Sequence, residues 1–173
     1  MNITIFNFFF SLSSNQSIAW SSLFVSNVLI YVFIVVAILI PIIINRDYIY
    51  SVLTMGGVVA SWIIAYIIKN IFLIPRPFVT LGVTPLFFES GFSFPSSHVT
   101  IIAALTVLVW RVNRKLGIVF LIFTILTGLS RMIIGVHYPI DVLAGACFGV
   151  IIGLCVIWFN TAIKRFAFLE KYR

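Results

Sequence analysis

Residues 23–44 read LFVSNVLIYVFIVVAILIPIII, a stretch of 22 residues in which no side chain is charged. An α-helix needs about 20 consecutive, mostly apolar residues to cross the hydrocarbon core of a bilayer. The stretch ends at Asn45-Arg46-Asp47, where polar and charged side chains resume. We therefore predict that residues 23–44 form a transmembrane helix.

The rest of the chain has the same apolar character. Of its 173 residues, 62% are hydrophobic and 9% are charged, and the mean hydropathy is +1.23. A soluble protein needs a far more polar surface, and a chain of this length is typical of one domain. The composition predicts an all-α, polytopic transmembrane helix bundle in which residues 1–173 form a single domain.

The apolar pattern predicts five clean spans. Besides residues 23–44, we expect them over residues 49–72, 97–111, 116–134 and 139–159. Residues 1–22 alternate Phe and Ile with Ser, Asn and Gln, which indicates an amphipathic helix at the interface or a sixth, poorer span. Residues 23–163 would then form the transmembrane core. A loop rich in Pro, Gly and Phe connects the second and third spans.

Positive charge is distributed unevenly about these spans. Eight of the eleven Lys and Arg residues fall on one side: Arg46, Arg111, Arg114, Lys115, Lys164, Arg165, Lys171 and Arg173. Cytoplasmic loops carry an excess of Lys and Arg, so we assign this side, including a tail of residues 164–173, to the cytoplasm. The cations flank apolar spans and form no stripe, so nucleic acid is not an expected partner.

The other three cations lie in two of three polar islands, and all three islands are on the outer side. The islands cover residues 69–77, 95–98 and 130–141. Ionisable residues between membrane spans are expensive, and they usually mark a functional site. Because all three islands fall on one face, we expect them to contribute to one shared site.

The third island pairs His137 with Asp141. These residues are four apart and share a helix face. A carboxylate beside an imidazole can fix one tautomer and leave the other ring nitrogen free to attack an electrophile. Arg131 precedes the pair by a short loop. The alternative is a helix-capping pair with an Arg that reaches the membrane surface.

The other two islands add an acid and anion-binding groups. Ser96 is a natural N-cap, and the helix that it starts would offer N–H groups to an anion. His98, in the first turn, could donate a proton to a leaving oxygen. Lys69 and Arg76 could bind phosphate, Arg76 from a rigid position between two prolines. The alternatives are a simple cap and cations that meet lipid headgroups.

The two cysteines, Cys147 and Cys155, are eight residues apart in an apolar run. On a helix this spacing is a rise of roughly 12 Å, beyond the reach of a disulfide. We expect two unpaired thiols.

The islands together resemble the motifs of the type 2 phosphatidic-acid phosphatase superfamily, whose integral-membrane members dephosphorylate lipids. The matching pattern is Lys69-x6-Arg76-Pro77, then Pro95-Ser96-x-His98, then Ser130-Arg131-x5-His137-x3-Asp141. The flanking sequence is similar to the short bacterial undecaprenyl-diphosphate phosphatases of the bacitracin-resistance type. Examples are residues 75–79, 126–131 and 137–143. Ser97 stands where much of the superfamily has Gly.

The resemblance implies a role for each site residue. His137 would attack phosphorus and form a phosphohistidine, Asp141 would orient it, and His98 would protonate the leaving group and later activate water. The phosphate would be bound by Lys69, Arg76, Ser96, Ser97 and Arg131. No metal and no cofactor are expected, because the fixed cations would take the place of a metal.

The implied function is hydrolysis of a lipid phosphate that stays in the bilayer, first of all undecaprenyl diphosphate. Phosphatidylglycerophosphate and lipid A phosphates are rival substrates. A lipid phosphotransferase would use the same chemistry, and an anion transporter is a distant alternative. We expect a multi-pass protein of the bacterial inner (cytoplasmic) membrane with its site facing the periplasm or exterior. The residues do not specify an oligomeric state.

Overall fold

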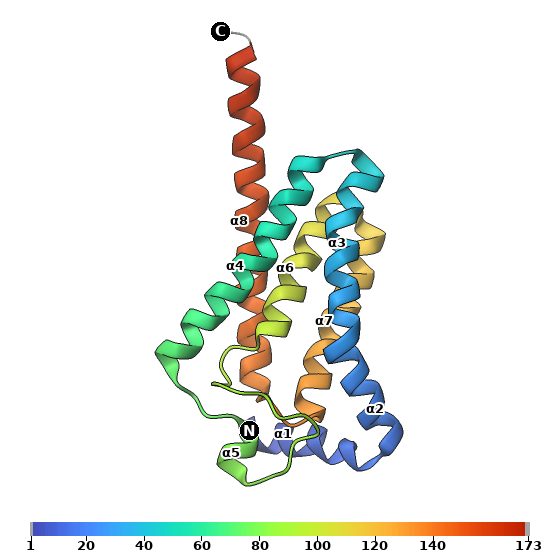
Figure 1. Ribbon diagram of the computed structural model, residues 1–173, viewed down its shortest axis with the longest axis vertical. Helices are drawn as coiled ribbons and strands as arrows, with labels where there is room; N and C mark the ends of the chain where they lie inside the picture. The colour runs from blue at the N-terminus through green and yellow to red at the C-terminus, as the bar shows by residue number, and fades with distance from the viewer. Residues whose placement is uncertain (1, 172–173) are drawn as a thin grey trace.

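The computed structural model describes residues 2–171, so Arg173 of the cytoplasmic charge count lies outside the described residues. No strand occurs between residues 2 and 171, and the predicted all-α class is confirmed. Figure 1 shows the helices as a bundle. They are α1 (Asn2–Ser11), α2 (Gln16–Phe24), α3 (Ile30–Asn45), α4 (Tyr48–Phe72), α5 (Pro77–Leu81), α6 (Ser97–Val112), α7 (Arg114–Ile133) and α8 (Pro139–Lys171).

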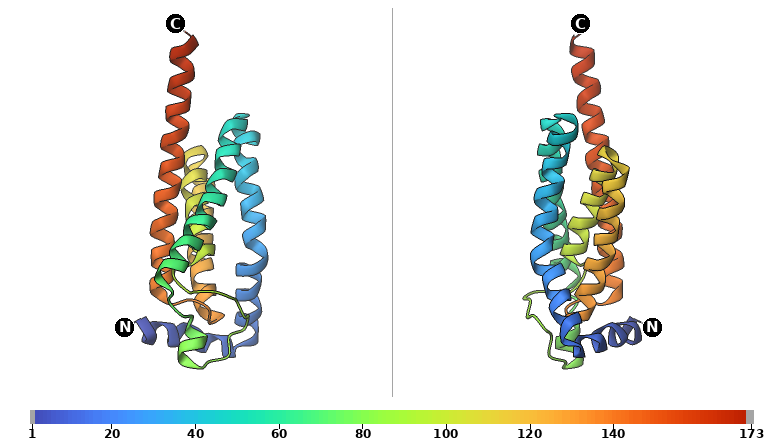
Figure 2. Two further views of the ribbon diagram at one scale, coloured as in Figure 1. Left: turned by 60° about the vertical axis from the view of Figure 1, so that its left-hand side comes forward. Right: turned by 90° about the vertical axis from the view of Figure 1, so that its right-hand side faces the viewer.

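The N-terminal segment divides into two parts. Helix α1 lies across the end of the bundle, as Figure 2 shows, and it is followed by a short 3-10 turn (Leu12–Ser14). The side chain of Asn15 then accepts hydrogen bonds from the N–H groups of Ser17 and Ile18 and caps α2. A π-helical turn (Val25–Leu29) joins α2 to α3. The first long helix therefore begins at Gln16 and not near residue 23, so residues 16–22 belong to it.

Four of the helical stretches between residues 2 and 166 are long and apolar enough to cross a membrane. They are Gln16–Asn45, Tyr48–Leu81, Arg114–Ile133 and Pro139–Phe166. The remaining expected span is α6, which has 16 residues. The other long helices surround α6 (Figures 1 and 2), and most of its side chains are buried. Helix α8 continues past the expected end at residue 159, and Cys147 and Cys155 are free and exposed on it.

Helices α6 and α8 touch at a row of glycines. Gly145, Gly149 and Gly153 recur every four residues on the face of α8 that meets α6. A Cβ atom placed on Gly145 would lie 2.8 Å from the carbonyl oxygen of Ser96, and one on Gly149 would lie 2.7 Å from the Cβ of Ala103. Small residues at such spacing let two membrane helices approach closely. The row therefore sets the distance between α6 and the N-terminal half of α8.

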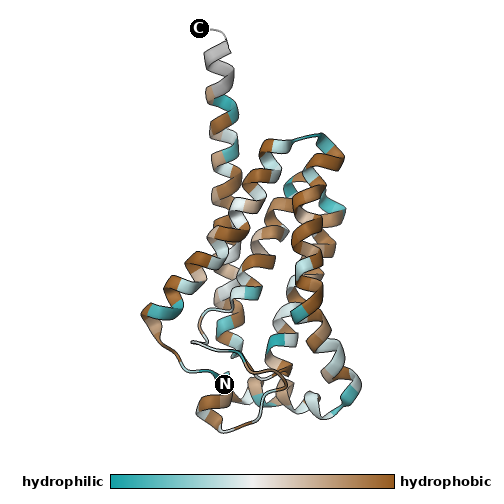
Figure 3. Cartoon of the chain, in the orientation of Figure 1, coloured by the Kyte–Doolittle hydropathy of each residue, from teal (hydrophilic) through white to brown (hydrophobic). Residues whose placement is uncertain are grey.

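The two ends of the bundle differ in charge. The turns at Arg46 and Arg114 lie at the end from which α8 projects, where Lys164 Nζ is 2.6 Å from Asp47 Oδ2. The polar islands lie at the opposite end, and Figure 3 shows the mostly apolar middle that separates the two ends. The prediction that the islands share one face of the membrane agrees with this arrangement.

We expect that replacing Gly149 by Ala destabilises the folded protein by about 1–3 kcal/mol, because an added methyl group has no room between α6 and α8. Gly56→Ala on α4 is the matched control, since nothing lies within 4 Å of a Cβ atom added there. It should stabilise its helix by up to about 1 kcal/mol. Thermal unfolding in detergent measures both. Equal unfolding midpoints would contradict the close packing of α6 on α8.

Candidate active site

The structure brings the three islands together at one end of the bundle. Each site residue stands at a helix end or in a turn: Lys69 in the last turn of α4, Arg76 before α5, Ser96, Ser97 and His98 at the start of α6, Arg131 in the last turn of α7, His137 between α7 and α8, and Asp141 in the first turn of α8. The prolines that begin α5 and α8 therefore also help to position the polar side chains.

His137 and Asp141 form the expected pair. The His137 ring is 1% exposed, and its Nδ1 lies 3.5 Å from Asp141 Oδ2. The backbone N–H of Tyr138 donates to the same carboxylate oxygen at 2.8 Å. Proline at position 139 begins α8, so the turn places His137 just before the helix that carries Asp141.

Ser93 is a third member of this group, and the sequence analysis did not single it out. Its hydroxyl donates to Asp141 Oδ2 and lies 3.4 Å from His137 Nδ1. Its backbone N–H donates to the carbonyl oxygen of Ile74 at 2.8 Å. The only sequence signal was its position just before the second island. Ser93 thus links the loop between α5 and α6 to the histidine–carboxylate pair.

Arg76 connects the same loop to His137. Its backbone is extended between two prolines, and its side chain is buried. Nε donates to the carbonyl oxygen of Gly91 at 3.0 Å and Nη2 to that of Ser90 at 3.1 Å. Nη1 lies 3.5 Å from His137 Nε2. The two prolines therefore hold Arg76 in the position that we expected. Its guanidinium group is directed at His137 Nε2, the ring nitrogen that faces away from Asp141.

Glu89 lies between the two arginines, and it too was missed. Its Oε2 is 2.7 Å from Arg76 Nη1, accepts from Arg131 Nη2, and lies 3.9 Å from His137 Nε2. Burial raises the pKa of Glu89, but the charges of Arg131 and Arg76 outweigh burial and hold it below its ordinary value. The carboxylate is therefore anionic. The sequence did contain a signal that could have identified Glu89, because it is the only acidic residue between the first two islands.

Lys69 also bonds to the loop. Its Nζ donates to the carbonyl oxygens of Phe92 at 2.8 Å and Ser93 at 3.0 Å. Residues 89–93, which we call the acceptor segment, thus present a carboxylate and four backbone oxygens to the cations of the site. In this state the cations expected to bind phosphate are bound to the protein itself.

Some donors at the site have no protein partner among the described residues. They are the Nε and Nη1 of Arg131 and the hydroxyl of Ser96, all buried. Ser96 stands at the N-cap position of α6, but its side chain forms no cap hydrogen bond, which differs from the cap that we expected. Its backbone N–H donates to the carbonyl oxygen of Asp141 at 3.0 Å. Buried donors without partners are costly, so they indicate where a ligand oxygen would be bound.

His137 is neutral at neutral pH. Burial and then the positive charges of Arg131 and Lys69 lower the pKa of His137 well below its ordinary value of 6.5. His98 is half-buried in the first turn of α6. In the tautomer that carries its proton on Nδ1, beside Asp141, the neutral imidazole has a free electron pair on Nε2, which is directed toward Arg76.

A cavity of about 350 Å³ adjoins the cations. It is lined by Lys69, Arg76, Glu89 and Ser97, and its outer wall includes Trp62 and Tyr66, whose rings stack with centroids 5.9 Å apart. This cavity gives a ligand access to the site from the side of α4.

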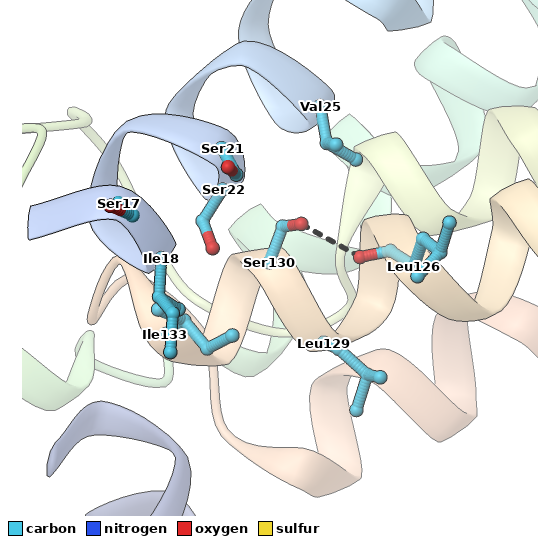
Figure 4. A pocket seen from close by; sticks show the side chains of 9 residues that line it. All are labelled: Ser17, Ile18, Ser21, Ser22, Val25, Leu126, Leu129, Ser130 and Ile133. Carbon is cyan, nitrogen blue, oxygen red and sulfur yellow. Dashed lines mark hydrogen bonds between the residues drawn. The ribbon is translucent and has the colours of Figure 1, made fainter. Parts of the chain in front are cut away.

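Another cavity, of about 310 Å³, lies between α2 and α7 and is drawn in Figure 4. Its lining includes Ser22 and Ser130, but the hydroxyl of Ser130 donates to the carbonyl oxygen of Leu126 at 2.7 Å within its own helix. None of the predicted site residues lines this cavity. Ser130, which begins the third island, therefore faces α2 and not the site.

The fold and this site define a multi-pass membrane helix bundle with a histidine–carboxylate pair and a cluster of cations at one end. A family model described as the PAP2 superfamily matches residues 46–165, and the chain belongs to this superfamily. The predicted family is thereby confirmed.

Individual relatives agree with this assignment. The undecaprenyl-diphosphatase BcrC of Bacillus subtilis (strain 168) is 38% identical over 109 residues, which cover 62% of this chain and 56% of the relative. The chain thus spans about half the length of the curated relatives that it matches.

Two crystal structures share the fold. Aquifex aeolicus LpxE has a TM-score of 0.73 and 19% identity, and the match covers 90% of this chain and 94% of that one. A transmembrane PAP2-type phosphatidylglycerolphosphate phosphatase from Bacillus subtilis has a TM-score of 0.63 and 20% identity, with 95% and 96% covered.

We expect Ser93→Ala to lower kcat for phosphate release from a lipid phosphate about 10- to 100-fold with little change in KM, because it removes a buried hydrogen bond that positions the Asp141 carboxyl group. Ser90→Ala is the control, since the bond of Ser90 to Arg76 uses only its backbone oxygen. Steady-state kinetics of both variants test the role. Similar kcat values for the two would show that the Ser93 hydroxyl does not position the pair.

Proposed function

We propose that this protein hydrolyses a lipid phosphate through a phosphohistidine on His137. The observation that carries the proposal is the direction of His137 Nε2. This nitrogen belongs to a buried, neutral ring and lies 3.5 Å from Arg76 Nη1. Next to it, between Arg76 and Arg131, is the position that Glu89 Oε2, an anionic oxygen, occupies. A phosphoryl group bound there would stand next to the nucleophile.

The reaction has two steps. In the first, the Nε2 electron pair forms a bond to phosphorus while the bond to the leaving oxygen breaks. His98, which is an imidazolium in the substrate complex, gives that oxygen a proton. Asp141 accepts a hydrogen bond from Nδ1–H and stabilises the positive charge that the ring gains. In the second, His98 takes a proton from a water molecule that attacks phosphorus, and the bond to His137 breaks. Free phosphate leaves, and both histidines return to their starting states.

The cations stabilise the transferred group. The charge on its oxygens is spread over three equatorial atoms in the transition state, and fixed donors lower the energy of that state. Arg76 and Arg131 supply planar pairs of N–H donors, and Lys69 adds a third charge. Ser96 and the N–H of Ser97 complete the set of donors. In this scheme neither a metal ion nor a cofactor takes part.

Undecaprenyl diphosphate is the substrate that we propose. Similarity to an undecaprenyl-diphosphatase supports it, as do the apolar side chains exposed along α3, α4 and α8, which an isoprenoid tail could contact. A phosphate anhydride also has a good leaving group, the lipid monophosphate. Phosphatidylglycerol phosphate and lipid A phosphates remain the rival substrates, because their reacting groups present the same charge to the site.

We further propose that residues 1–173 act as one membrane phosphatase domain in the bacterial cytoplasmic membrane. The excess of positive charge at the end that carries Arg46 and Lys164 supports a cytoplasmic position for that end. The site would then face the periplasm or the exterior.

Phosphate release by the purified protein tests the function. Undecaprenyl diphosphate, phosphatidylglycerol phosphate and a lipid A 1-phosphate are offered separately with EDTA present. We expect the fastest release from the diphosphate, with EDTA having little effect, and a loss of at least about a thousandfold in His137→Ala. A strict metal requirement would contradict the mechanism, as would normal turnover by the variant. Release only in the presence of a lipid acceptor would identify a phosphotransferase.

Labelling of single cysteines in intact cells tests the orientation. In a background with Cys147 and Cys155 replaced by Ala, a membrane-impermeant maleimide should label Thr84→Cys, in the loop near the site, and not Lys115→Cys at the other end. The reverse pattern would show that the site faces the cytoplasm.

A further inference from the structure

The acceptor segment occupies the position where the proposed reaction needs a phosphate group. The Glu89 carboxylate bridges Arg76 Nη1 and Arg131 Nη2, the donors that the transferred phosphoryl group would use. It also lies 3.9 Å from His137 Nε2, where the electrophile would stand. A carboxylate and a phosphate are both anions whose oxygens accept hydrogen bonds from guanidinium groups. They therefore compete for the same two arginines.

The two anions cannot share this position without strong repulsion. Coulomb repulsion between like charges rises as solvent is excluded, and Arg131 is fully buried here. A phosphate must therefore displace Glu89 before it can reach His137. The cost of breaking two charge-assisted hydrogen bonds is subtracted from the binding free energy of every phosphate ligand.

We propose that Glu89 determines substrate specificity as an internal competitor, which excludes soluble phosphates from the site and admits phosphates that are carried by a lipid. This inference rests on the proposed lipid phosphatase function. A cost that all phosphates met equally would not discriminate between them, so the selectivity comes from the tail. A lipid that contacts the loop beside Glu89 can use that binding energy to displace the carboxylate, and a soluble phosphate makes no such contact.

The position of Glu89 in its loop fits such a role. Phe87 and Phe88 immediately precede it and are 45% and 69% exposed, so a lipid that contacts these rings acts on the residues next to the carboxylate. Gly91 follows with a φ of +78°. The backbone is fixed on both sides, by a hydrogen bond from Leu86 N–H to the Ile134 carbonyl oxygen at 3.0 Å and by the bond from Ser93 N–H. A conformational change that moves Glu89 can therefore be confined to the residues between these two hydrogen bonds.

Unpaired donors give an arriving phosphate a first point of attachment. The Nε and Nη1 of Arg131 and the hydroxyl of Ser96 are buried and lack protein partners among the residues described. They remain available while Glu89 is still bound to Arg131 Nη2. A lipid phosphate can thus bind Arg131 before the carboxylate withdraws into the adjoining cavity, which Glu89 itself lines.

The binding of inorganic phosphate to the full chain in detergent, measured by isothermal titration calorimetry, tests the competition without any turnover. We expect Glu89→Gln to bind phosphate about tenfold more tightly than the unsubstituted protein, a change of about 1.4 kcal/mol. Asp47→Asn is the matched control. It removes the same charge at the opposite end of the bundle, where Asp47 pairs with Lys164, and it should leave phosphate binding unchanged.

Selectivity is the second readout. The ratio of kcat/KM for undecaprenyl diphosphate to that for a short-chain, water-soluble diphosphate should fall about tenfold in Glu89→Gln and stay constant in Asp47→Asn. Unchanged or weaker phosphate binding by Glu89→Gln, or an unchanged ratio, would overturn the inference. If the unsubstituted protein hydrolyses no lipid, the proposed function fails, while the calorimetric comparison still decides whether Glu89 competes with phosphate.

A second variant covers the case in which Glu89→Gln does not fold. Glu89→Asp keeps the charge but shortens the side chain, so its carboxylate cannot bridge both arginines as before, and tighter phosphate binding is again expected. Equal or weaker binding by a folded Glu89→Asp would overturn the inference in the same way.

Discussion

The contact between α6 and α8 is the constraint on which the site depends. The row Gly145, Gly149 and Gly153 brings the two backbones together, and the N–H of Ser96 bonds to the carbonyl oxygen of Asp141 across the gap. One helix carries His98 and the other follows His137. A wider separation would pull the two histidines apart and move Ser93 away from the carboxylate of Asp141. The apolar packing of the bundle therefore sets the geometry of its polar end.

A second constraint is that the buried cations of the site need hydrogen-bond acceptors. Lys69, Arg76 and Arg131 cannot be removed from water without acceptors, because unpaired buried charges are very costly. The acceptor segment supplies most of those acceptors. The loop between α5 and α6 is thus a structural partner of the cations and not merely a connection. This double use explains why one segment can both stabilise the empty site and oppose a ligand.

Much of this could be predicted from residue patterns, and the failures have physical causes. Long apolar runs and charge asymmetry identified the spans, and the i, i+4 spacing identified His137 with Asp141. Ser93 and Glu89 were missed because they lie in a loop without periodicity, and only the folded chain brings them to residues 40 or more positions away. The start of the first long helix was misplaced because Asn15 provides a cap that a hydropathy count does not register.

Helix α1 lies outside the matched family region of residues 46–165, yet it packs beneath the turn that carries His137. Phe6 is fully buried against Tyr138, with ring centroids 5.6 Å apart. At Gly135, with a φ of +87°, a Cβ atom would lie 2.8 Å from the ring of Phe10. A side chain at position 135 would consequently be opposed twice, by the strain of this backbone conformation and by the ring of Phe10 from α1. Chimeras that exchange the matched region between related chains should carry α1 with it.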